Sequence, residues 1–109
     1  MNNMQRVDIY QPEEQLRKLV NGFKMKEYLF GGSLRHLTLE DADHWINNPM
    51  SYPVDFRNKK LFLWGSLCVV DGAHCVPCLE WCAGRIIRTN TWLGDAWHKN
   101  RYAAIIKVA

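Results

Sequence analysis

All four cysteines of the chain lie close together in the sequence, at Cys68, Cys75, Cys78 and Cys82, and none occurs elsewhere. We expect no structural disulfide, because one would need an oxidising environment and Cys75 and Cys78 could pair only through a tight loop. The N-terminal segment MNNMQRVDIYQPEE contains no basic stretch followed by an apolar one. We therefore expect no secretory signal and a reducing, cytoplasmic location, in which the thiols are free or metal-bound.

The size and composition of the chain predict a globular protein. Its length of 109 residues is close to that of one typical domain, so we expect residues 1–109 to form a single domain. Hydrophobic residues make up 48% and charged residues 23%, which argues against intrinsic disorder. The net charge is only +3 and the basic residues are scattered, so non-specific binding to phosphate backbones should be weak. The longest apolar run, 61–70, is too short to cross a bilayer, which predicts a soluble protein without a membrane partner.

Two helices are predicted in the N-terminal half. Pro12 followed by two glutamates is typical of a helix start, because carboxylates favour the positive end of the helix dipole. Helical spacing of apolar residues extends this prediction over 12–28. The residues on its apolar face are Leu16, Leu19, Val20 and Phe23. Thr38, with Asp41 three positions later, approximates a capping box and predicts a second, short helix that ends before Pro49.

Strands are predicted mainly in the C-terminal half. The segments with strand-like composition are 61–70, 86–93 and 101–108. The first has large apolar residues on both alternating faces, as a strand covered on both sides would have. The alternative for the last segment is a helix over 95–107. Pro77 fits the first turn of a short helix that would carry three cysteines on one face. The predicted fold is therefore α+β, with two N-terminal helices and a short cysteine-bearing helix packed on a small, mainly antiparallel sheet.

The cysteine cluster raises the alternative of a metal site. Cys75 and Cys78 have the spacing of one half of a structural zinc site. The remaining cysteines do not form the second pair that such sites usually have, so we expect buried thiols that act as small hydrophobic residues, and no cofactor. The alternative is a zinc-stabilised nucleic-acid-binding module. Its ligands would be drawn from Cys68, Cys75, Cys78, Cys82 and His74.

The segment Cys75-Val76-Pro77-Cys78 resembles the Cys-x-Pro-Cys motif of the thioredoxin family. That resemblance implies a thiol oxidoreductase in which a helix dipole lowers the pKa of the first thiol. The family also places a cis-proline loop against these cysteines, whereas Pro77 is the last proline of this chain, so we do not assign the chain to it. A small cysteine-dependent enzyme is a further alternative. The one histidine beside a cysteine in the sequence is His74, and adjacent residues rarely face each other.

A binding role needs no catalytic constellation, and the C-terminal third of the chain favours it. Trp, Tyr and Arg dominate binding hot spots, and a domain this small cannot bury every aromatic ring. The predicted partner-binding residues are Arg85, Arg88, Trp92, Trp97 and Arg101. We expect a non-enzymatic intracellular protein that binds another macromolecule, with a protein as the first choice of partner and nucleic acid as the other class.

The general character of the chain suggests a biological setting. In its small size and lack of motifs, it resembles phage and mobile-element accessory proteins, which include inhibitors of bacterial defence systems. This resemblance rests on no particular residues. It implies a protein that acts by occupying the surface of a larger partner.

Overall fold

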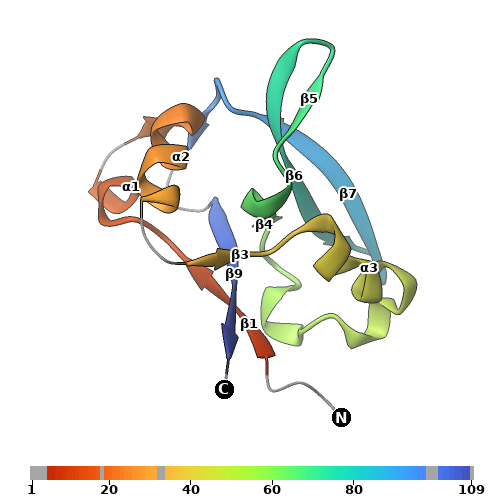
Figure 1. Cartoon of the computed structure of the whole chain (residues 1–109). Helices are drawn as coiled ribbons and strands as arrows, with labels where there is room; N and C mark the ends of the chain where they lie inside the picture. Colours follow the sequence, from red (N-terminus) through yellow and green to blue (C-terminus); the bar gives the residue numbers. More distant parts are fainter. Residues whose placement is uncertain (1–4, 18, 32–33, 98–100, 109) are drawn as a thin grey trace.

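The protein has an α+β fold in which helices pack against a mostly antiparallel sheet, as the sequence predicts (Figure 1). The computed structural model describes residues 5–17, 19–31, 34–97 and 101–108. The helices are α1 (Glu13–Arg17), α2 (Gly22–Phe30) and α3 (Leu39–Asn47), with 3-10 turns at Pro49–Ser51, Val54–Phe56 and Trp64–Ser66. The strands are β1 (Gln5–Tyr10), β2 (Val20–Asn21), β3 (Arg35–His36), β4 (Leu61–Phe62), β5 (Cys68–Val70), β6 (Ala73–Cys82), β7 (Arg85–Trp92), β8 (Ala96–Trp97) and β9 (Tyr102–Val108). None of the helices in these residues has the length and apolar character needed to cross a bilayer.

β6 is the long central strand of the main sheet. The strand order is β1-β9-β4-β6-β5, with β3 added to β9 and β7 added to β6. β4 links the two halves, because it runs antiparallel to β6 and parallel to β9, while the other strand pairs are antiparallel. β4 and β5 both pair with β6 along one of its edges, and β7 takes the other edge. β2 and β8 form a separate two-stranded sheet.

The main sheet is covered by apolar side chains on both faces. Successive residues of a strand point to opposite faces, so Phe62 joins one buried cluster and Leu61 joins the other. The helix residues in these clusters are Met25 and Leu29 of α2 in the first, and Ala42 and Trp45 of α3 in the second. The predicted two-sided burial of 61–70 is thus confirmed for its first half. The segment is not one strand, however, because the 3-10 turn Trp64–Ser66 separates β4 from β5.

The predicted capping box of α3 is present. The Thr38 side chain accepts a hydrogen bond from the N–H of Asp41, and the Asp41 carboxylate accepts one from the N–H of Thr38. These bonds satisfy backbone donors that have no partner within the first turn of a helix. The helix ends at Asn47, just before Pro49, as predicted.

The prediction of one helix over 12–28 is wrong. α1 ends at Arg17, and α2 begins at Gly22 with Asn21 as its N-cap. The segment between them pairs with β8 instead of continuing the helix. Gly22 gives the physical reason, because its N–H donates to the carbonyl oxygen of Leu93, and a Cβ at this position would lie 2.4 Å from that oxygen. The backbone at Gly22 therefore lies in close contact with the segment after β7, at a position within the predicted helix.

The predicted cysteine-bearing helix is also wrong, since its residues belong to β6. Two-residue turns flank this strand, and Asp71, Gly72, Ala83 and Gly84 all have positive φ values between 51° and 82°. Such turns match the twist of paired strands and favour hairpins. β6 is therefore fixed between β5 and β7, and hairpin pairing overrides the helical spacing of its cysteines.

The two other predicted strands are confirmed. β7 and β9 lie within one residue of the predicted segments 86–93 and 101–108. The alternative of a helix over 95–107 is wrong, because β9 is paired with β1 on one side and with β3 and β4 on the other. β1 was not predicted from the sequence. It forms one outer strand of the sheet, and β7 forms the other long one.

Candidate functional site

β7 carries three of the predicted partner-binding residues, and the pattern of its backbone hydrogen bonds can be read from the structure. In an antiparallel pair, residues alternate between pairs that exchange backbone hydrogen bonds and pairs that do not. The N–H of Leu93 donates to the carbonyl oxygen of His74 at 2.9 Å, so these two residues form a bonded pair just beyond the end of β7. Counting back from Leu93 along β7, every second residue is therefore hydrogen-bonded to β6.

This alternation sorts the residues of β7 into two sets. Those bonded to β6 are Arg85, Ile87, Thr89 and Thr91, and those that direct their backbone groups away from β6 are Ile86, Arg88, Asn90 and Trp92. Within the part of the chain that the structure describes, β7 pairs with no strand other than β6, and Figure 1 shows it as the outermost strand on its side. Near Ile86, α3 lies against β7, and the carbonyl oxygen of Trp92 accepts a hydrogen bond from Asp95. We call the remaining open stretch, Arg88 to Trp92, the β7 edge.

The side chains of Arg88, Asn90 and Trp92, whose backbone groups face outward on the β7 edge, are exposed. Neither Arg85 nor Arg88 forms an ion pair or hydrogen bond with another described residue. Trp92 is 54% exposed, and its ring lies so close to Gly94 that a Cβ there would be 3.0 Å from the indole. Gly94 thus lets the ring lie against the backbone. Arg88, Asn90 and Trp92 share one face of the strand, which spaces Arg88 and Trp92 about 13 Å apart.

The other two predicted partner-binding residues lie elsewhere. Trp97 is fully buried and packs against Phe62 and Trp64, with ring centroids 4.6 and 5.1 Å apart. It belongs to the core and has no surface to offer a partner. The guanidinium of Arg101 lies 5.2 Å above the Trp97 ring and 3.8 Å from the Asp95 carboxylate. The structure therefore groups Arg85, Arg88 and Trp92 on β7 and separates Arg101 from them.

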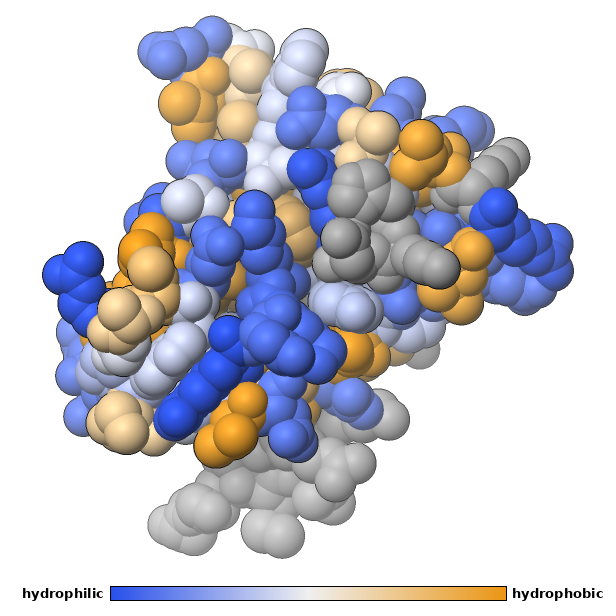
Figure 2. All heavy atoms as spheres, turned by 180° about the vertical axis from the view of Figure 1, so that it is seen from behind, coloured by the Kyte–Doolittle hydropathy of each residue, from blue (hydrophilic) through white to orange (hydrophobic). Residues whose placement is uncertain are grey.

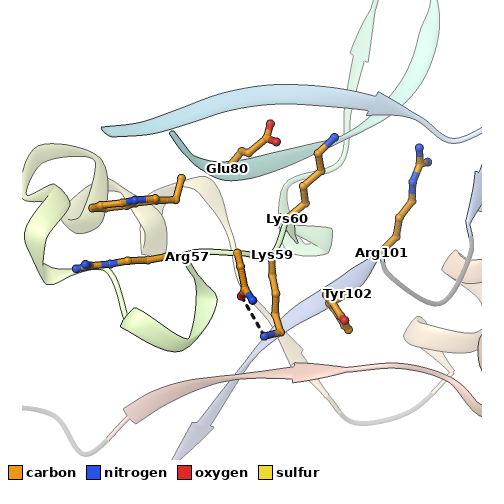
Figure 3. A pocket seen from close by; sticks show the side chains of 8 residues that line it. Arg57, Lys59, Lys60, Glu80, Arg101 and Tyr102 are labelled. Carbon is orange, nitrogen blue, oxygen red and sulfur yellow. Dashed lines mark hydrogen bonds between the residues drawn. The ribbon is translucent and has the colours of Figure 1, made fainter. Parts of the chain in front are cut away.

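Arg101 lines a second feature, which we call the basic pocket (Figure 3). The pocket has a volume of about 490 Å³ and lies where β4 and β9 begin beside the far end of β6. Its lining residues are Arg57, Asn58, Lys59, Lys60, Glu80, Trp81, Arg101 and Tyr102. Figure 3 shows Lys60, Glu80 and Arg101 extending to one side of the ribbon, with Lys59 and Tyr102 on the other.

An arginine and a tryptophan form one wall of the basic pocket. The guanidinium carbon of Arg57 lies 4.2 Å from the centre of the Trp81 ring, and its Nη2 donates to the carbonyl oxygens of Met50 and Tyr52. The ring of Tyr52 stacks parallel to Trp81 at 6.0 Å. Burial, with a smaller contribution from Cys78, raises the pKa of Tyr52 above its ordinary value. The wall is therefore anchored in the apolar core.

The basic pocket was not predicted, although the sequence contains a signal for it. The run Arg57-Asn58-Lys59-Lys60 places three basic residues in four positions, directly before an apolar strand. The other basic residues are spread over the whole chain, so the low net charge hides this local run. The contribution of Trp81 and Arg101 could not be read in this way, because they reach the pocket from β6 and from the start of β9.

The four cysteine side chains do not point toward a common site. Cys75 and Cys78 are buried and, three residues apart on a strand, point to opposite faces, while Cys82 is exposed near the turn. Cys68 lies opposite Cys75 in the β5–β6 pair. Among the described residues, no three His, Cys, Asp or Glu side chains are grouped as metal ligands would be. His74 is exposed and neighbours Cys75 on the strand, so it points to the other face.

On the far side of the molecule, hydrophobic residues form small separate patches among polar ones (Figure 2). The coloured residues of this face therefore form no broad apolar patch. The arrangement as a whole provides two polar features, the β7 edge and the basic pocket. No protein-family model matches the chain, and comparisons with curated proteins and with solved structures find no match.

Proposed function

We propose that the chain is a non-enzymatic intracellular protein that binds a protein partner, and that an extended acidic segment of that partner adds to the sheet along the β7 edge. The observation that carries this proposal is the open backbone of Arg88, Asn90 and Trp92 beside exposed arginine and tryptophan side chains. An edge strand with unpaired N–H and C=O groups is a template for another strand. Five such groups line this stretch, namely the N–H and C=O of Arg88 and of Asn90 and the N–H of Trp92.

The side chains select the kind of segment. Arg88 lies on the edge, and Arg85 lies three residues before it on the opposite face of β7. Neither has an acidic partner among the described residues, so both charges are available to carboxylates of the partner. The same two arginines oppose pairing of β7 with β7 of a second copy, because like charges on adjacent strands repel. Trp92 adds a large, half-exposed ring at the end of the edge, where it can cover an apolar residue of the partner.

The proposed role is that of an accessory protein that works by occupying a partner's surface. Inhibition of a bacterial defence protein is one form that such a role takes. Strand addition suits it, because main-chain hydrogen bonds supply affinity while the flanking side chains supply specificity.

A random peptide library selected on the immobilised chain tests the proposal. We expect the selected peptides to alternate acidic with apolar residues. We expect the double variant Arg85→Glu, Arg88→Glu to lower the affinity for these peptides about tenfold or more, because two attractive charges become repulsive. Asn90→Pro should abolish binding, because it removes an outward N–H and places a ring on the edge.

Arg17→Glu is the matched control, because Arg17 is an exposed cation on α1, which lies on the opposite side of the molecule from β7 (Figure 1). It should leave affinity within about twofold, as expected for a distant surface charge. Selection of peptides without acidic residues, or of peptides that bind the Asn90→Pro variant as well as the original chain, would overturn the proposal. Concentration-dependent dimerisation lost in Asn90→Pro would assign the edge to a second copy instead.

A further inference from the structure

The basic pocket has an excess of positive charge that its own residues do not neutralise. Four cations line it against a single carboxylate, that of Glu80. Arg57 and Lys59 donate hydrogen bonds to neutral carbonyl oxygens, and Lys60 has no hydrogen bond or ion pair with a described residue. Among the described residues, Arg101 is the one lining cation that forms an ion pair, with Asp95 at 3.8 Å. A multiply charged anion would be attracted to this pocket.

Two buried donors of the lining arginines make no hydrogen bond with a described residue, Arg57 Nε and Arg101 Nη1. Arg101 Nη1 is the atom that lies 3.8 Å from Asp95 Oδ2, which is beyond hydrogen-bond distance. A buried donor without an acceptor is costly, and oxyanions are strong acceptors for guanidinium groups. Because these atoms have almost no accessible surface, each side chain would have to rotate slightly to reach a bound anion. Such a rotation would give both donors an acceptor.

The aromatic wall favours recognition by charge over base stacking. Arg57 already lies over the Trp81 ring at 4.2 Å, and Tyr52 is stacked parallel to the same ring. The ring is therefore engaged within the protein and does not form an open platform for a nucleobase. It instead holds the guanidinium of Arg57 at the edge of the pocket.

We propose that the basic pocket binds a compact oligophosphate group, such as the diphosphate or triphosphate of a small ligand. Four cations line the pocket, and Lys60 and Arg101 extend to the same side of it, which matches an anion that concentrates three or four negative charges within a few bonds. The volume of about 490 Å³ is within the usual range for small-ligand sites. A nucleic-acid strand spreads its charges along a line and would need an extended basic groove, which this pocket does not provide.

Calorimetric titration of the full chain with inorganic tripolyphosphate tests the proposal at physiological ionic strength. Tripolyphosphate should bind, and inorganic phosphate should bind far more weakly. Lys60→Gln should lower the affinity for tripolyphosphate about fivefold, because it removes one unpaired cation. Glu80→Gln should raise this affinity by a similar factor, because it removes the single carboxylate of the lining. Lys60 is exposed, so the folded state should tolerate its substitution.

Matched controls separate the pocket from general charge effects. Lys26→Gln and Glu14→Gln change the net charge by the same amounts at exposed sites on α2 and α1, and neither should alter affinity. Equal binding of phosphate and tripolyphosphate, or equal effects of pocket and control variants, would overturn the proposal. A nucleoside triphosphate should bind as tripolyphosphate does. Binding of a single-stranded oligonucleotide without binding of tripolyphosphate would likewise contradict it. Asn90→Pro should leave tripolyphosphate affinity unchanged, so the two sites can fail independently.

Discussion

Pro77 lies opposite Asn90 in the β6–β7 hairpin, in a pair of residues that exchange no backbone hydrogen bonds. β7 therefore does not need the N–H that proline lacks. The carbonyl oxygen of Pro77 is used on the other edge of β6, where it accepts a hydrogen bond from Leu63 at 2.9 Å. This position allows a proline within the longest strand of the sheet, and it fixes which residues of β7 face outward.

Two proline substitutions on neighbouring residues should have opposite outcomes. Asn90→Pro removes an N–H that points away from β6, so the free energy of unfolding should stay within about 1 kcal/mol of the original value. Thr91→Pro removes an N–H that bonds to β6 and should cost about 3 kcal/mol or more. Chemical denaturation measures both. Equal losses in the two variants would show that the assigned alternation of β7 is wrong.

Hairpin pairing explains which parts of the fold could be predicted from the sequence. The alternating residues of β7 and β9 and the Thr38–Asp41 cap are local signals, and all three gave correct elements. The cysteines of β6 have helical spacing, but the strand is fixed by turns on both sides and by partners on both edges. Sequence spacing alone cannot weigh such tertiary contacts against local periodicity.

The candidate site shows the same division. Exposure of Arg85, Arg88 and Trp92 followed from residue type and from a correctly predicted strand. Trp97 lies five positions after Trp92 and was grouped with these residues because it is near them in the sequence, yet it packs in the core. The basic pocket assembles residues from three segments that are distant in sequence, so only the run 57–60 could have indicated it.

Tyr52→Phe should not destabilise the protein. The Tyr52 hydroxyl is buried and has no hydrogen-bond partner among the described residues, so its removal leaves the free energy of unfolding unchanged or raises it by about 1 kcal/mol. Because burial raises the pKa of Tyr52, the unfolded chain loses this proton near pH 10 while the folded chain retains it. The free energy of unfolding of the original chain should therefore fall as pH rises above 10, and that of the Tyr52→Phe variant should fall less. A loss of more than about 1 kcal/mol at neutral pH would mean that the hydroxyl has a stabilising partner.

His36 should make stability depend on pH on the acid side of neutrality. Burial lowers its pKa below the ordinary value of 6.5, although a hydrogen bond between Nε2 and the Leu29 carbonyl oxygen opposes the shift. Below pH 6.5 the unfolded chain binds a proton that the folded chain does not, so stability is full above this pH and declines beneath it. Denaturation between pH 7.5 and about 5 should show a smaller decline for His36→Gln. His44→Gln, at an exposed position on α3, should keep the original slope.

The four thiols should react with an alkylating reagent in the order of their exposure. Cys82 is exposed, Cys68 is intermediate, and Cys75 and Cys78 are buried. Timed iodoacetamide labelling of the folded chain, read by peptide mass spectrometry, should modify Cys82 first and Cys75 and Cys78 last. Faster modification of Cys75 than of Cys82 would contradict the view of its thiol as an inert core group and would favour a cysteine-dependent activity.

Residue-resolved amide exchange along β7 tests the central claim of strand addition most directly. In the free protein, the amides of Arg88 and Asn90 should exchange fast and those of Thr89 and Thr91 slowly, because the two sets face opposite edges. Saturation with a selected acidic peptide should slow exchange at Arg88 and Asn90 and leave Thr89 and Thr91 as they were. Unchanged fast exchange at Arg88 and Asn90 in the saturated complex would contradict the account, because no strand would then have formed on the β7 edge.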